Sequence, residues 1–274
     1  MSTSVHSNAA AQIALQNLNQ INDRLTGTQN RISTGLKVGG AKDNSAVWAI
    51  AQNQRADLGA LGAVRTSLDR ATSLADVSLA AGESISDLII QMRQKAVAAS
   101  DVSQSAESRA AYNDDFQALV RSVQQFADSA SFDGVNLLDD SLAGPLDFLA
   151  SIDTTDTISI DPQDMTSAGL GLAPLALLTQ AGAAAALTAI DAALTNVNSA
   201  LAALGSQAKQ IETHNKFVSK LADTLETGIG KLVDADLAKE SARLQALQVQ
   251  QQLGTQALSI ANQAPQMILS LFRN

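Results

Sequence analysis

Residues 187–232 read LTAIDAALTNVNSALAALGSQAKQIETHNKFVSKLADTLETGIGKL. Apolar side chains recur along this stretch at alternating intervals of three and four residues. One track of the repeat has no polar member: Ile190, Val197, Leu204, Ile211, Val218, Leu225 and Leu232. The partner track has a single one, Asn215: Leu187, Leu194, Leu201, Ala208, Asn215, Ala222 and Ile229. This spacing is the seam of a coiled coil. At ~1.5 Å per residue, such a helix is a rod about 70 Å long.

Two more helices are predicted upstream of this rod. From Leu61 onward two tracks run together, and only Gly82 and Ser78 in them lack an apolar side chain: Leu61, Leu68, Ala75, Gly82, Ile89, Ala96 and Val64, Ala71, Ser78, Ile85, Met92, Ala99. A shorter track follows with Tyr112, Phe116, Leu119, Val123 and Phe126, and it ends at the turn signature Ser131-Phe132-Asp133-Gly134. The two helices are expected to form an antiparallel pair.

The helical period is lost between about residues 135 and 180. Apolar residues alternate there in two runs, Leu146 to Ile152 and Ile158 to Ile160, on either side of a turn at 153–156. This pattern predicts a small β-hairpin. The fold class is therefore mainly α, a long antiparallel helical rod with one small hairpin.

Both ends of the chain carry a further helical seam. The N-terminal seam contains Ala11, Ala14, Leu18, Ile21, Leu25, Thr28 and Ile32, and a connector with an N-cap at Asp43-Asn44-Ser45 follows it. The C-terminal seam contains Leu253, Ala257, Ile260, Ala264, Met267 and Leu271, with Pro265 predicting a kink or a helix restart at 261–265. Each apolar stripe needs a cover, either the other terminal helix or another copy of the chain, so the pattern favours self-assembly.

Composition excludes several classes of function. The formal net charge is −9 at pH 7, which disfavours nucleic acid and anionic membrane surfaces as partners. Cysteine is absent, which removes disulfides, thiol catalysis and thiolate metal sites. The first twenty residues lack a basic leader and an apolar core, so no conventional signal peptide is expected. The most apolar stretch, 168–178, is too short and too interrupted to cross a bilayer.

No catalytic or metal-binding constellation is found in the sequence. His6 and His214 are far apart, and the carboxylates Asp139, Asp140, Asp161 and Asp164 lack the spacing of a calcium loop. The glycines at 39 and 40 lack the order of a phosphate-binding loop. The sequence therefore predicts neither an enzyme nor a cofactor.

Motifs at both termini resemble bacterial flagellin. The N-terminal ones are ALQNL at 14–18, RISTGLKV at 31–38 and AKDNSA at 41–46. The C-terminal ones are DADLAKE at 234–240, QQLGTQAL at 251–258, ANQAPQ at 261–266 and LSLFR at 269–273. Roughly residues 1–138 and 183–274 are similar to the family, and the short middle implies a flagellin without large inserted outer domains.

The resemblance implies a subunit that polymerises into the filament used for swimming, found outside the cell and exported by the flagellar type III apparatus without a cleaved signal. It implies an inner-core domain of two paired helices, 1–35 and 232–274, a connector at 36–45 and an outer-tube rod at 46–231. The self-assembly residues would be Leu18, Ile21, Leu25, Ile32, Leu253, Ile260, Met267 and Leu271. Further partners would be an export chaperone, the filament cap and hook-junction proteins.

One difference from the family concerns a receptor. Flagellins detected by the vertebrate innate flagellin receptor carry Arg and Leu where this chain has Gln91 and Lys95, while Arg93 is retained. The resemblance therefore implies weak receptor activation. Two other functions remain open from the sequence: a hook–filament junction protein, and a soluble coiled-coil adaptor or export chaperone that binds partner helices.

Overall fold

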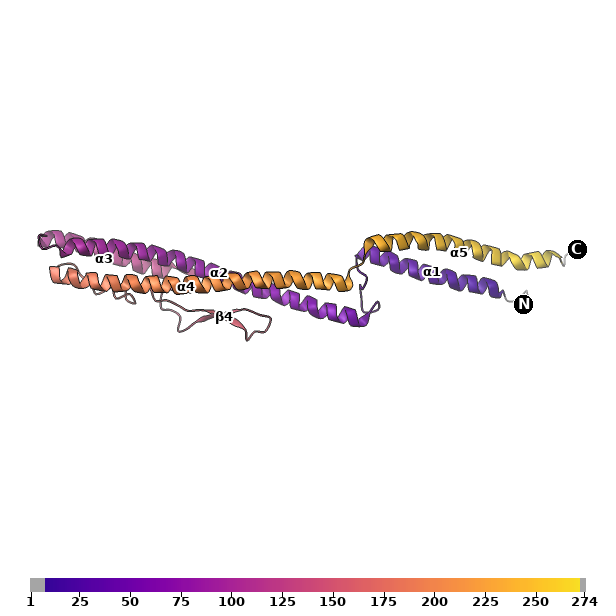
Figure 1. Cartoon of the computed structure of the whole chain (residues 1–274), viewed down its shortest axis with the longest axis horizontal. Coiled ribbons are helices and arrows are strands. Elements are labelled where there is room, and N and C mark those ends of the chain that lie inside the picture. The colour runs from indigo at the N-terminus through magenta and orange to yellow at the C-terminus, as the bar shows by residue number, and fades with distance from the viewer. Residues whose placement is uncertain (1–7, 272–274) are drawn as a thin grey trace. The chain divides into compact units, whose positions relative to one another are not determined.

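The computed structural model describes the backbone of residues 8–271 and the side chains of residues 8–263. Within these residues the chain forms five helices and four short strands, and Figure 1 labels the helices. In chain order they are α1 (Ala9–Thr34), α2 (Ser45–Ser100), α3 (Ala106–Ser129), β1 (Ser131–Phe132), β2 (Val135–Asn136), β3 (Leu146–Leu149), β4 (Thr157–Ile160), α4 (Gln180–Val233) and α5 (Leu237–Leu271). The predicted fold class, mainly α with a small β-hairpin, is confirmed.

The chain divides into two compact units. The terminal unit contains the residues up to Ala56 together with those from Thr224 onward, and the central unit contains Asp57–Asp223. Helices α2 and α4 each contribute to both units. Each unit has its own set of packed helices.

The central unit is built on the predicted seams. Its buried apolar side chains come from all three helices: Leu68, Ala75, Ile85, Ile89 and Met92 on α2, Phe116 and Val123 on α3, and Ile190, Val197, Leu204 and Ile211 on α4. Helices α2 and α3 are antiparallel, because Lys95 near the end of α2 pairs with Asp115 near the start of α3 while Arg70 pairs with Asp133 beyond the end of α3. Ser105 caps α3 by accepting a hydrogen bond from the Ser108 backbone N–H.

The predicted hairpin is present as β3 and β4. The two strands pair antiparallel with Leu146 opposite Ile160, and Ile158 and Ile160 turn their side chains to the core. A second small ladder, β1 with β2, closes over Asp133 and Gly134, whose φ angles are 53° and 78°. Two consecutive left-handed residues match the twist of a hairpin, which explains the Asp-Gly sequence there.

Residues 161–178 form an irregular segment, the strap, that the sequence pattern does not predict. Met165, Leu172 and Leu177 bury their side chains in the central unit. Polar side chains of α3 hold its backbone: Asn113 accepts from the Leu177 N–H at 2.9 Å, Gln117 donates to the Leu175 carbonyl at 2.7 Å, and Gln124 accepts from the Ser167 N–H at 3.1 Å. These side chains provide the hydrogen-bond partners that buried peptide groups require.

Helix α4 is long and apolar enough to cross a membrane by length and composition alone, and 22% of its most apolar window is buried. Its apolar residues belong to the seam described above, where Ile190, Val197 and Leu204 are fully buried. Packing within the central unit therefore accounts for these three residues.

Candidate self-assembly site

The terminal unit is an antiparallel pair of α1 and α5, which lie side by side in Figure 1. Leu18, Ile21, Leu25 and Ile32, the predicted seam residues of α1, are all half-buried, whereas most of their neighbours in sequence are exposed. The seam faces α5 near Gly254, because a Cβ at that glycine would lie 3.2 Å from Leu18 Cδ1 and 3.7 Å from Ile21 Cδ1. Glycine at this position lets the two helices approach closely.

Three polar contacts fix the pairing of α1 with α5. Asn8 donates its side-chain amide to the Ala261 carbonyl at 2.7 Å, and Gln251 donates to Asn22 at 2.7 Å. Arg31 lies 3.5 Å from the carboxylate of Glu240, whose side chain is only 10% exposed. Glu240 belongs to the first turn of α5, where a negative charge interacts favourably with the helix dipole.

A short backbone ladder joins the ends of the two helices. The Lys37 N–H donates to the Val233 carbonyl at 2.6 Å, and the Ala235 N–H donates to the Gly35 carbonyl at 2.8 Å. Gly35 ends α1 with a φ of 72°, a conformation that favours glycine. Val38 and Val233 bury their side chains beside the ladder. The motif RISTGLKV is thus the segment that turns α1 into this ladder.

The face of α5 that packs on α1 differs from the predicted one. Its less exposed positions are Glu240, Leu244, Leu247, Gln251, Gly254, Leu258 and Ala261. Leu253 and Ile260, predicted seam residues, are 60% and 65% exposed. Within the monomer α1 therefore does not cover these two residues, and their assignment to self-assembly stays a prediction. The chosen face contains Gly254 and Gln251, which permit close approach and a polar tie, and simple counting of apolar residues overlooks both.

The predicted C-terminal residues form an uncovered surface instead. We call Val249, Leu253, Ala257 and Ile260 the α5 stripe, since steps of four, four and three place them on one face of the helix. Val249 is 55% exposed, and sequence reasoning missed it. Ala264, Met267 and Leu271 continue the same spacing, but their side chains lie outside the described residues. The sequence predicted either a kink or a helix restart near Pro265. Helix α5 is uninterrupted to Leu271, so the helix does not restart there.

The receptor-related positions lie on α2 in the central unit. Gln91 is exposed, and Lys95 is half-buried. The Lys95 ammonium is 2.6 Å from an Asp115 carboxylate oxygen and 5.9 Å from the centre of the Tyr112 ring. Arg93 is likewise engaged within the chain, with its Nε 2.6 Å from Asp191.

Titratable groups do not gather into a reactive site among the described residues. No group of three His, Cys, Asp or Glu side chains is placed to hold a metal ion in residues 8–263. Asp139 and Asp164 accept hydrogen bonds from backbone N–H groups two residues further along, and Asp161 accepts one from Gln207. His214 contacts the Ala150 carbonyl at 2.6 Å and so ties the end of the hairpin to α4.

Comparison with known proteins identifies the family. Residues 5–143 match the bacterial flagellin N-terminal helical region, and residues 187–272 match the bacterial flagellin C-terminal helical region. Among curated proteins the chain is 48% identical to flagellin FljM of Caulobacter vibrioides, covering 98% of both chains. It is 37% identical to a flagellin of Brucella melitensis, covering 98% of this chain and 99% of that one.

Solved structures agree on the fold. The crystal structure of Bacillus cereus flagellin superposes with a TM-score of 0.51 at 23% identity, covering 56% of this chain and 88% of that chain. The structure of a protein described as flagellar hook-associated, from Vibrio parahaemolyticus, gives 0.59 at 13% identity over 70% of this chain and all of that one. The curated relatives favour neither the junction protein nor the adaptor, and they point to a structural, non-enzymatic protein. The chain belongs to the bacterial flagellin family and is a structural subunit of the extracellular flagellar filament, formed by self-polymerisation.

Proposed function

We propose that the α1–α5 pair is the inner core of the filament and that the α5 stripe binds the same pair in neighbouring copies. In this proposal residues 1–35 and 232–274 form the inner-core domain, 36–45 the connector and 46–231 the outer-tube rod. The observation that supports it is the exposure of Leu253 and Ile260, at 60% and 65%, on a helix whose opposite face is already covered. A contiguous apolar face of this kind marks an interaction surface.

The free energy gained by burying the α5 stripe is large enough for a contact between subunits of a polymer. Complete burial of a Val, Leu or Ile side chain contributes about 1.5–3 kcal/mol, and Val249, Leu253 and Ile260 each keep more than half of their surface exposed. Covering these three residues would contribute roughly 3–5 kcal/mol per contact, before the cost of ordering the partners. In a homopolymer every added copy makes this contact again, so a modest gain per copy is sufficient.

The direct test is polymerisation of the purified protein. Monomer is mixed with short filament seeds or with ammonium sulfate, and the pellet is viewed by negative-stain electron microscopy. Long uniform filaments are expected. A protein that stays soluble under both treatments, with protease-sensitive ends, would favour the adaptor or junction function instead.

We also propose export through the flagellar type III apparatus without cleavage of a signal peptide, with an export chaperone, the filament cap and hook-junction proteins as further partners. The support is the membership of the flagellin family. Amino-terminal sequencing of the filament protein and of the same protein inside the cell should give one and the same start. A start further along the chain would contradict export without cleavage.

We expect the monomer to activate the vertebrate flagellin receptor weakly. Gln91 has no charge to offer, and Lys95 presents an ammonium, held by Asp115, where the resemblance implies an apolar side chain. The loss of one central interface contact costs about 1–3 kcal/mol, so potency should be about 10- to 100-fold below that of a detected flagellin. Dose–response curves on receptor reporter cells measure this potency.

The reverse substitutions provide the matched comparison. The double variant Gln91→Arg/Lys95→Leu should regain potency, and Asp115 is exposed enough to be hydrated once Lys95 is gone. Gln94→Arg makes the same chemical change at a neighbouring exposed position and should leave potency unchanged. Full potency of the unmodified monomer would refute the expectation.

A further inference from the structure

The chain connections alone do not set the register of α4 along α2 in the central unit. Residues 101–105 join α2 to α3 directly, whereas residues 130–179 separate α3 from α4, so no short loop sets the position of α4 along α2. Their seams repeat every seven residues with mostly apolar members. A shift of α4 by one heptad, about 10 Å, would therefore again place apolar side chains opposite apolar ones.

Two polar contacts between α2 and α4 share one register. Asn215 donates its amide to an Asp69 carboxylate oxygen at 2.6 Å, and Arg93 donates its Nε–H to Asp191 at 2.6 Å. Arg93 follows Asp69 by 24 residues on α2, and Asn215 follows Asp191 by 24 residues on α4. The contacts thus lie about 36 Å apart along the antiparallel pair and require the same alignment.

A steric feature between them agrees with that alignment too. A Cβ built on Gly82 would lie only 2.7 Å from Leu201 Cδ2, so the absence of a side chain at Gly82 makes room for Leu201. Gly82 follows Asp69 by thirteen residues, and Leu201 precedes Asn215 by fourteen. Any other member of the α2 track that carries a larger side chain would not accept Leu201 in this way.

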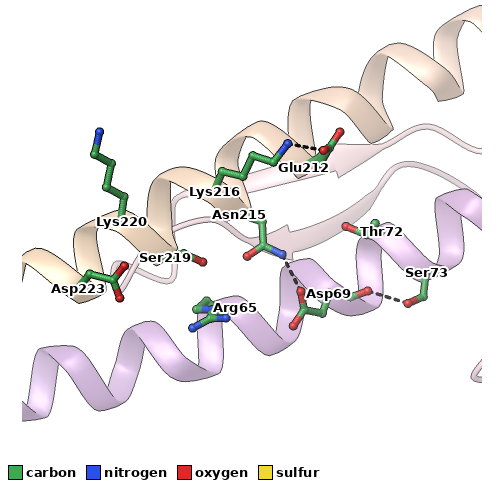
Figure 2. Close-up of a pocket in the computed structure, with 10 residues that line it drawn as sticks. All are labelled: Arg65, Asp69, Thr72, Ser73, Glu212, Asn215, Lys216, Ser219, Lys220 and Asp223. Carbon is green, nitrogen blue, oxygen red and sulfur yellow. Dashed lines mark hydrogen bonds and ion pairs between the residues drawn. The ribbon is translucent and has the colours of Figure 1, made fainter.

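Figure 2 shows how Asn215 makes its contact. It lines a cleft of about 600 Å³ between the two helices and points across it to Asp69. Lys216 turns back to Glu212 on its own helix instead, and its hydrogen bond lowers the pKa of that carboxyl group. Asn215, the single polar member of the α4 tracks, is therefore the seam residue that reaches α2 with a polar group.

We propose that the Asp69–Asn215 and Arg93–Asp191 contacts select the register of α4 on α2, and the space at Gly82 agrees with the register that they select. A polar residue in an apolar seam penalises the wrong alignments, at some cost in stability to the right one. The strap agrees with this alignment, since Asn113 and Gln117 hold residues 175–177 just before α4 begins. Uniform register would give every copy in a polymer the same surface, a consequence that rests on the proposed function.

The test measures register in the full-length monomer, so it remains readable whether or not filaments form. Because cysteine is absent, spin labels can be placed at Asp76→Cys on α2 and Thr188→Cys on α4, two exposed positions in the central unit. Pulsed electron paramagnetic resonance then reports the distance between them. The parent protein should give one distance.

The decisive variant is Asn215→Leu combined with Arg93→Gln. A second distance population should appear, displaced by about 10 Å. Asn215→Leu alone should raise the Tm by about 2–4 °C, because an apolar residue completes the seam. A single unchanged distance in the double variant would overturn the proposal. So would a lowered Tm with one distance for Asn215→Leu, which would make the contact merely a stabilising hydrogen bond.

Two further variants separate register from general damage. Exchanging the partners, Asp69→Asn with Asn215→Asp, rebuilds the hydrogen bond with donor and acceptor reversed, and with Arg93→Gln present it should restore the single distance. Asn198→Leu makes the same chemical change at an exposed position of α4 outside the seam and should leave the distance unchanged. Failure of the exchange to remove the second population would also overturn the proposal.

Discussion

The Leu253→Asp variant will fail to form filaments at concentrations where the parent protein polymerises, while its monomer keeps the helical content of the parent. Leu253 is 60% exposed and does not belong to the face of α5 that packs on α1, so a carboxylate there remains hydrated in the monomer. In the polymer the same carboxylate would be buried in an apolar contact, which costs at least several kcal/mol. The critical concentration should rise by about 100-fold or more.

The measurement is a sedimentation assay of seeded polymerisation, with far-ultraviolet circular dichroism on the unpolymerised fraction. Gln252→Asp introduces the same charge next to Leu253 but on a face that is already polar, and it should polymerise normally. Ile21→Asp should also abolish polymerisation, but by a different route, because Ile21 lies between α1 and α5 in the monomer. If Leu253→Asp formed unchanged filaments, the α5 stripe would not be a subunit contact of the inner core.

Apolar periodicity predicted the central helices well. Each α4 residue from Ile190 to Val218 on the unbroken track is buried, because a seam of this length has only one face that can be covered. The cap at Asn44 was also readable, and its side chain accepts a hydrogen bond from the Val47 N–H. These features depend on residues close together in the chain, which is why a single sequence contains them.

The strap was not predictable in the same way. Its backbone is held by Asn113, Gln117 and Gln124, polar residues that on α3 alone would be interpreted as a hydrated face. Their partners lie more than forty residues away. Local sequence propensity does not depend on such distant hydrogen bonds and so cannot predict them. The sequence pattern therefore predicted the hairpin at 146–160 and left the segment after it undefined.

The phase of α5 shows a second limit. Two faces of this helix are partly apolar, one with Leu244, Leu247 and Leu258 and one with Val249, Leu253 and Ile260. Counting apolar residues does not say which face binds α1, because Gly254 and Gln251 decide it through close approach and a hydrogen bond to Asn22. The prediction that both stripes need a cover therefore leaves a question that only assembly experiments answer.

Phe116→Ala should destabilise the central unit by about 3–5 kcal/mol, since Phe116 is fully buried and is among its largest core side chains. The change removes a ring from the interior and leaves a cavity that long, tightly packed helices cannot readily close. Urea unfolding followed by circular dichroism measures the loss. Phe126→Ala, on the same helix, removes an identical ring that is already 39% exposed and should cost roughly 1–2 kcal/mol.

The comparison of the two phenylalanines tests whether α3 supports the rod by burial or only by covering its surface. Phe116 lies one residue before Gln117, so a collapse of the core there would also disturb the hydrogen bond that holds the strap at Leu175. Hydrogen exchange at residues 175–177 should therefore rise in Phe116→Ala and stay unchanged in Phe126→Ala. Equal losses of stability for the two variants would mean that the interior of the central unit relaxes around Phe116, against the tight packing inferred from its complete burial.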